Sequence, residues 1–300
     1  MPNIYQHISQ NKRDTAVIMF FFICIVTFIS WFIGYYFYEG SGLAFVGFAL
    51  IFSGITSFIS YYNSDKIVLG ISGAKKVTYE QAPRLHQLVE NISIASGLPK
   101  PDVYLINDTA MNAFATGRDP DHAVICFTTG IVNSLEKREL EGVVAHEMSH
   151  IGNYDIRFMS IVSVLVGSIT LLADWFTRGR LYRGRRSSRS SSGSGIIMLI
   201  GLVFIILSPI IATLIKLALS RHREYLADST AALITRYPKG LADALRKLSQ
   251  DREILEAANG ATSHLYIVSP LTSQGVSSFF SKLFSTHPPI QERIKRLETM

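Results

Sequence analysis

Two long uncharged runs near the start of the chain limit most strongly what it can fold into. They cover residues 16–38 and 43–62, and the short turn between them carries a single charge, Glu39. A transmembrane α-helix needs about 20 consecutive apolar residues, and both runs reach that length. Only 17% of all residues are charged, which is low for a water-soluble protein. We therefore predict that residues 1–62 form a short polar tail followed by two transmembrane helices.

Basic residues beside these runs predict their orientation. Lys12 and Arg13 precede the first run, and Lys66 follows the second. The positive-inside rule places such residues in the cytoplasm, so we expect the N-terminus and everything after residue 62 to face that side. The first run is longer than the apolar part of a signal peptide and lacks a small-residue cleavage site, so we interpret it as a retained anchor.

Two further apolar runs, residues 156–176 and 196–215, predict a return to the membrane and bring the apolar membrane segments to four. If both runs cross, the loop between them lies outside the cytoplasm, against the positive-inside rule. If they do not cross, they form a re-entrant or interface-lying hairpin. The loop, residues 177–195, has no acid and contains Arg178, Arg180, Arg183, Arg185, Arg186 and Arg189.

The segment between the second and third runs carries the pattern His-Glu-x-x-His, formed by His146, Glu147 and His150. Residues four apart lie on one face of an α-helix, so the two imidazoles can bind one Zn²⁺. Glu147 then lies beside the metal and can accept a proton from a metal-bound water. The alternative is a pair of core histidines beside a salt-bridged glutamate.

The residues around this pattern predict a helix. Asn133 and Glu136 have the spacing of a capping box, and Gly152 is a plausible end. The pattern would then occupy the last two turns. The apolar residues at helical spacing form a stripe made of Leu135, Leu140, Val143, Val144 and Ile151.

A hydrolytic zinc site needs a third protein ligand and leaves the fourth position to water. Glu224 lies in a stretch that favours a helix, and Asp228 is four residues further on, so the two share a face. Glu224 can bind the metal while Asp228 orients a ligand imidazole through a hydrogen bond. His222 is the rival ligand, but it points to nearly the opposite face from Glu224.

The remaining patterning predicts an α+β protein that is mainly helical. We expect strands at residues 103–106, 112–116 and 123–128, and helices at residues 79–96, 221–236, 239–259 and 290–298. Cys24 and Cys126 lack partners at metal-binding spacing, so we predict buried free thiols in a reducing compartment. The net charge of +6 is concentrated in one loop, and the chain has no nucleic-acid-binding motif.

Four motifs carry a resemblance that covers nearly the whole chain. His146–His150 and Ser220–Asp228 are similar to the metal-binding segments of the membrane-embedded gluzincin proteases, the family of the HtpX-type proteases and the CaaX prenyl endoprotease. Asn112-Ala113-Phe114-Ala115-Thr116-Gly117 lies upstream, and Thr286-His287-Pro288-Pro289 with Arg293 lies near the C-terminus. Their order also matches the family.

The resemblance implies a zincin-like metalloprotease core with a small, edge-exposed sheet. Its catalytic portions would be residues 63–155 and 216–300, separated by a membrane hairpin at residues 156–215. It implies one Zn²⁺ per chain, bound by the three ligands named above.

The resemblance also assigns roles to residues outside the metal site. His287 and Arg293 would bind the oxyanion, and Asn112, Ala113 and Phe114 would bind the substrate backbone at a strand edge. From the residues alone, core packing is the favoured explanation for Phe114, and a turn before two prolines is the favoured explanation for His287.

The function implied is a zinc endopeptidase in the inner membrane of a prokaryote, with its active site in the cytoplasm. Its substrates would be misfolded or damaged membrane proteins, and its other contact would be the lipid bilayer. Two alternatives remain open at this point. One is processing of lipidated C-termini, and the other is a non-catalytic membrane scaffold or transporter that retains the motif.

Overall fold

The computed structural model describes residues 4–37, 42–167, 221–257, 262–263, 265–268 and 288–300. The fourth apolar run, the arginine-rich loop and His287 fall outside these residues.

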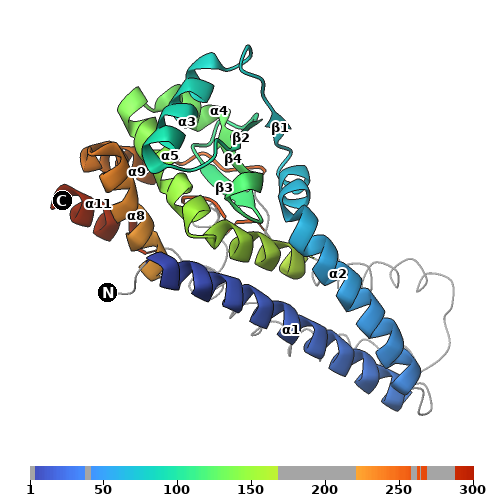
Figure 1. Ribbon diagram of the computed structural model, residues 1–300. Coiled ribbons are helices and arrows are strands. Elements are labelled where there is room, and N and C mark those ends of the chain that lie inside the picture. Colours follow the sequence, from blue (N-terminus) through green and yellow to red (C-terminus); the bar gives the residue numbers. More distant parts are fainter. Residues whose placement is uncertain (1–3, 38–41, 168–220, 258–261, 264, 269–287) are drawn as a thin grey trace.

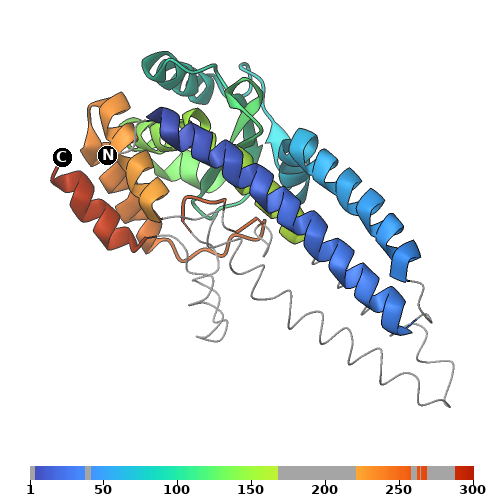
Figure 2. The ribbon, with the colours of Figure 1, turned by 60° about the horizontal axis from the view of Figure 1, so that its bottom comes forward.

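Two long helices, α1 (Ile4–Phe37) and α2 (Gly42–Ile71), pack along one another and extend away from the body that holds the sheet (Figure 1, Figure 2). Within them, Ile8–Phe32 and Phe45–Ile71 are long and apolar enough to cross a membrane. Their outer faces expose large apolar side chains, including Phe20, Phe48 and Phe58. Such faces are unfavourable in water and suit contact with lipid.

Helix α2 continues beyond the apolar run that predicts it. The run ends at residue 62, whereas the helix continues to Ile71 after a local kink at Asn63, where φ is −129° and ψ is 18°. Val68 and Leu69 in the extension are buried in a core cluster, so packing against the body favours the added turns. The second apolar helix is therefore joined to the body by helix rather than by a flexible linker.

The sheet has four strands in the order β1-β2-β4-β3: β1 (Lys75–Lys76), β2 (Asp102–Ile106), β3 (Ala113–Gly117) and β4 (Ala123–Thr128). Strand β2 pairs with β4 in parallel, and the other two pairings are antiparallel. The three longer strands match the prediction to within one residue. The sequence did not predict β1, because two lysines carry no alternating pattern. Strand β3 forms one edge.

The helix that carries the two histidines is shorter than predicted, and the capping box is elsewhere. Helix α5 (Lys137–Gly152) follows a separate short helix, α4 (Thr129–Ser134). The box is formed by Glu136 with Glu139, not by Asn133 with Glu136. The extended backbone of Leu135 ends α4, so Asn133 lies inside a helix and cannot start one.

Two other helices differ from the prediction at one end. Helix α3 (Pro83–Ser96) begins four residues later than expected, because the backbone N–H of Thr78 donates to the side chain of Gln81 in a turn that precedes it. Helix α9 (Pro238–Gln250) ends well before residue 259. There the Asp251 carboxylate accepts backbone hydrogen bonds from Met111 and Glu253, which holds the chain in a non-helical path.

Helix α5 forms the centre of the body. It contacts β3 and α3, and it also packs against α8 (Arg221–Thr235) and α9. A Cβ added at Gly142 would lie 2.6 Å from the backbone nitrogen of Leu241, so glycine permits the close approach of α5 and α9. The C-terminal helix α11 (Ile290–Glu298), which matches its prediction, covers α9 and α8.

Residues 155–167, the start of the third apolar run, are helical, and most of their side chains are buried inside the protein. Cys126 is a buried free thiol as predicted, whereas Cys24 is exposed. The prediction for Cys24 is wrong, because its apolar surroundings are the outer face of α1 and not a protein core.

Candidate metal centre

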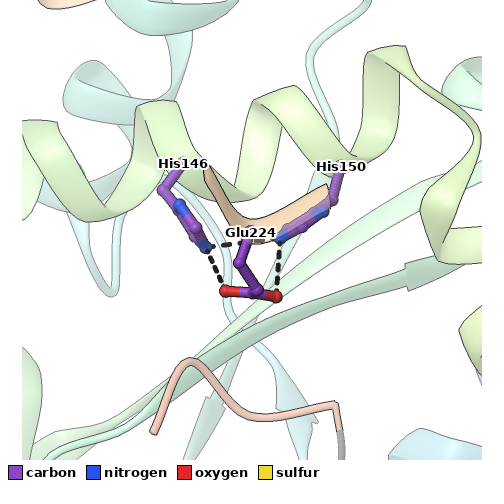
Figure 3. A group of neighbouring side chains, drawn as sticks. All are labelled: His146, His150 and Glu224. Atoms are coloured by element: carbon purple, nitrogen blue, oxygen red, sulfur yellow. Dashed lines mark hydrogen bonds and ion pairs between the residues drawn. The ribbon is translucent and has the colours of Figure 1, made fainter. Parts of the chain in front are cut away.

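Two imidazoles and one carboxylate converge at the centre of the body. His146 and His150 extend from one face of α5, and their Nε2 atoms are 3.3 Å apart. Glu224 approaches from α8, with Oε2 3.6 Å from His146 Nε2 and Oε1 3.7 Å from His150 Nε2 (Figure 3). All three side chains are buried. The three predicted metal ligands therefore meet, although Glu224 is far from the histidines in sequence.

These distances fit a tetrahedral zinc ion. With bonds of about 2.0 to 2.1 Å to nitrogen and oxygen, two ligand atoms of a tetrahedron lie about 3.3 Å apart. The ligand atoms of His146, His150 and Glu224 all lie within 4.8 Å of one another. His222, the rival ligand, is exposed on α8 and does not belong to the group of three buried ligands.

Each imidazole has a carboxylate behind it. His146 Nδ1 lies 3.1 Å from Asp228 Oδ1, and His150 Nδ1 lies 3.0 Å from Asp155 Oδ2. A hydrogen bond at Nδ1 leaves the lone pair of Nε2 free to bind a metal and fixes the plane of the ring. Asp228 thus has the position predicted for it, whereas the sequence analysis missed Asp155.

Arg293 brings α11 into the same centre. Its guanidinium is 0% exposed, donates to both oxygens of Asp228 over 2.9 and 2.7 Å, and lies 3.2 Å from Glu224 Oε2. Burial alone would raise the pKa of the Asp228 carboxyl, but the charge of Arg293 and the bond to His146 lower it below its usual value. Arg293 therefore favours the ionised form of the Asp228 carboxylate in the protein interior.

Glu147 follows the first histidine and is also buried. Burial raises the pKa of its carboxyl to about 7, against the opposing effects of the nearby charges of His150 and Arg293 and a backbone hydrogen bond from Ala115. A carboxyl group with a pKa near 7 is well matched to accept and return a proton at neutral pH.

The two imidazoles differ in their affinity for protons. Burial lowers the pKa of His146. Burial has the same effect on His150, but the carboxylates of Asp155, Glu224 and Glu147 outweigh it and raise the pKa to about 9. An anionic environment of this kind favours any cation, and a metal ion that binds here replaces a proton.

The three residues predicted to bind substrate lie at or beside the edge strand β3, close to a segment from the C-terminal part of the chain. The N–H of Ile267 donates to the carbonyl of Ala113 over 3.0 Å, and the Asn112 amide donates to the carbonyl of Val268 over 2.9 Å. The Phe114 side chain is 1% exposed and packs edge-to-face on Tyr266. The ring of Phe114 thus belongs to the core, the alternative that its residue type suggests.

The structure adds residues that sequence reasoning did not find. Asp155 receives a 2.7 Å hydrogen bond from the side chain of Asn11, and Arg223 Nη1 lies 3.8 Å from the same oxygen. The one available signal for Asp155 was an acid shortly after the end of the histidine helix. Nothing in the local sequence marks Asn11.

Comparison with known proteins gives a consistent picture. Residues 79–300 match the family described as Peptidase family M48. The chain is 44% identical over 296 residues to a protein named Protease HtpX homolog from Dictyoglomus turgidum, covering 99% of this chain and 94% of that protein. A protein of the same name from Tropheryma whipplei (strain Twist) is 43% identical, with 99% and 98% covered.

A solved structure shares the fold. The crystal structure of S. mikatae Ste24p superposes with a TM-score of 0.52 at 22% identity, covering 85% of this chain. The chain spans 58% of that protein, so the likeness concerns the fold alone.

Proposed function

This chain belongs to peptidase family M48 and is a metallopeptidase, and we propose that it is an integral-membrane, zinc-dependent endopeptidase. The observation that carries the proposal is the meeting of His146, His150 and Glu224 at separations that suit one tetrahedral ion. A scaffold or transporter would not need a buried ligand triad in which carboxylates back both imidazoles.

His146, His150 and Glu224 would hold one zinc ion per chain. When bound, zinc supplies Lewis acidity, which makes a water nucleophilic at neutral pH and polarises the scissile carbonyl. Asp228 and Asp155 accept the Nδ1 protons of His146 and His150, so both Nε2 atoms would be free to bind the ion.

Glu147 acts as the general base. Its carboxylate accepts the proton of the attacking water and then returns it to the leaving amine. The raised pKa of about 7 supports this role, because the group can exist in both protonation states near neutral pH.

Arg293 holds Glu224 and Asp228 in place, and we assign it, together with His287, a share in binding the oxyanion of the tetrahedral intermediate. The support for Arg293 is its complete burial beside the ligand Glu224. His287 lies only a few residues before the helix that carries Arg293.

The substrates we propose are polypeptides, in particular misfolded or damaged membrane proteins. Two helices long and apolar enough to cross a membrane support this assignment, and so does the edge position of β3, the strand to which we assign substrate binding through Asn112, Ala113 and Phe114. A peptide that adds to a strand edge is bound through its backbone, so many sequences can be accepted. We place the catalytic portions, residues 63–155 and 216–300, in the cytoplasm at the inner membrane of a prokaryote, with residues 156–215 as a membrane hairpin.

The test is the Glu147→Gln variant of the full-length protein in detergent. Metal analysis should still find one zinc per chain, because the ligands are intact. Casein cleavage should fall about 10²- to 10⁴-fold, the usual contribution of a general base. Glu141→Gln is the matched control, since Glu141 lies on the same helix and is paired with Lys137 away from the metal centre. Cleavage by Glu147→Gln at the wild-type rate would refute the assignment.

A further inference from the structure

The start of helix α1 contacts the turn that follows the metal-binding helix. The Nδ2 atom of Asn11 donates to the backbone carbonyl of Asn153 over 2.9 Å and to Asp155 Oδ1 over 2.7 Å. Each contact joins two residues that are far apart in the sequence, separated by 142 positions in the first case and by 144 in the second. In Figure 1 the first turns of α1 lie beside the start of α8, and residues of both helices line a common pocket with Asp155.

The turn itself needs support. Tyr154 has a φ of 61°, a left-handed conformation that is uncommon for a residue with a side chain. The ammonium of Lys12 lies 4.3 Å from the centre of the Tyr154 ring, next to the hydrogen bonds made by Asn11. Two successive residues of α1 therefore hold both Tyr154 and its neighbours.

Asp155 depends on this contact for its orientation. The residue is 1% exposed, and a buried carboxylate needs a hydrogen-bond donor at each oxygen. One oxygen faces His150, and the other receives the short bond from Asn11. Arg223 lies farther from that second oxygen, at 3.8 Å. Asn11 is thus the closest of these partners on the side away from the histidine.

We propose that Asn11 is a positioning residue of the metal centre. Its amide fixes the Asp155 carboxylate, which fixes the His150 ring and thereby holds the ligand nitrogen toward zinc. The inference rests on the proposed function, because it takes the three-ligand site to be a zinc site. It adds that the anchor helix, which precedes the region shared with the peptidase family at residues 79–300, contributes to metal binding.

The experiment measures zinc affinity in the full-length protein, by competition with a chromophoric chelator. Asn11→Leu keeps the branched shape of the side chain and removes its donor. We expect zinc to bind about 10-fold more weakly, at the lower end of the effect of losing an outer partner of a metal-bound histidine. The visible absorption band of the Co²⁺-substituted protein should also change, because the His150 ring is less well oriented.

A double-mutant cycle separates this role from mere docking of α1. If Asn11 acts through Asp155, Asn11→Leu should have little further effect on zinc affinity in an Asp155→Ala background. Equal losses in both backgrounds would overturn the proposal, as would wild-type affinity in Asn11→Leu. If Asn11→Leu fails to fold, Asn11→Ser, whose hydroxyl is too short to reach Asp155, takes its place in the cycle.

Thr15→Val is the matched control. Thr15 is a buried polar residue one turn further along the same helix, and its hydroxyl donates to the backbone carbonyl of Asn11. Zinc affinity should stay within about twofold of wild type, because the side-chain amide of Asn11 keeps its hydrogen bonds to Asn153 and Asp155. A wild-type protein that binds no zinc would refute the proposed function instead, so the two failures can be told apart.

Discussion

The two histidines that we propose as metal ligands have the same immediate geometry but different support. Behind His146, Asp228 is held by the two-pronged guanidinium of Arg293, which is completely buried. Behind His150, Asp155 is held by a neutral amide from Asn11, with Arg223 farther away. One half of the centre is fixed by charge from the C-terminal helix, and the other by a hydrogen bond from the N-terminal helix.

This difference indicates which half costs more to disturb. A buried cation that loses its carboxylate is left with a large desolvation penalty, whereas a neutral amide that loses its acceptor is left with a smaller one. A mutation in the half with Arg293 should therefore weaken metal binding and also lower the stability of the whole fold. A mutation in the half with Asn11 should mainly weaken metal binding.

The largest effect is expected from Asp228→Ala. It removes the partner of His146 and leaves Arg293 with Glu224 as its remaining ion pair at 3.2 Å. We expect the free energy of unfolding to fall by about 3 to 5 kcal/mol and zinc to be lost. Thermal unfolding and metal analysis measure the two effects.

Asp243→Ala is the control for that prediction. Asp243 is a partly exposed carboxylate that pairs with Arg246, and both residues lie on α9. Such pairs contribute about 0.2 to 1 kcal/mol to the free energy of unfolding. A stability loss in Asp228→Ala no greater than in Asp243→Ala would show that the buried ion pair is not the stronger support.

Asp155→Ala should have a smaller effect on stability and a clear effect on the metal. In the zinc-bound protein the free energy of unfolding should fall by about 1 to 3 kcal/mol, since the partners that lose an acceptor are the neutral amide of Asn11, the neutral metal-bound ring of His150 and the more distant Arg223. Zinc affinity should fall about 10- to 100-fold, because His150 loses the group that orients it. Chelator competition measures the affinity. If this variant destabilises the fold as much as Asp228→Ala does, the two halves are equivalent and the comparison fails.

Lys12→Ala should have the smallest effect. It removes a cation–π contact with Tyr154 at the surface, which contributes about 0.5 to 1 kcal/mol. Zinc affinity should change little, because Asn11 still holds Asp155. A loss of affinity as large as that of Asn11→Leu would show that docking of α1, rather than the amide, supports the metal centre.

The sequence predicted the parts of the site that depend on local periodicity or on residue type. The spacing of His146 and His150 on a helix needs no tertiary information, and Glu224 was identified because a zinc site lacks a third ligand without it. The strands β2, β3 and β4 were predicted for the same reason, since alternation and branched residues are local signals.

What the sequence could not predict depends on contacts between distant segments. Asn11 is an ordinary polar residue in a helix until Asp155 is placed against it. The continuation of α2 past its apolar run depends on the burial of Val68 and Leu69, which composition does not reveal. The early end of α9 likewise depends on Asp251 meeting the backbone of Met111.

The pairing of Ile267 with Ala113 has a thermodynamic consequence for any peptide that docks on β3. The carbonyl of Ala113 already accepts a hydrogen bond over 3.0 Å, so an incoming strand that pairs there must displace an internal competitor. One main-chain hydrogen bond is then exchanged for another, with a net gain close to zero. The affinity for an incoming chain at this point must therefore depend on how easily residues 265–268 yield, and selectivity among chains must come from the side chains that replace them.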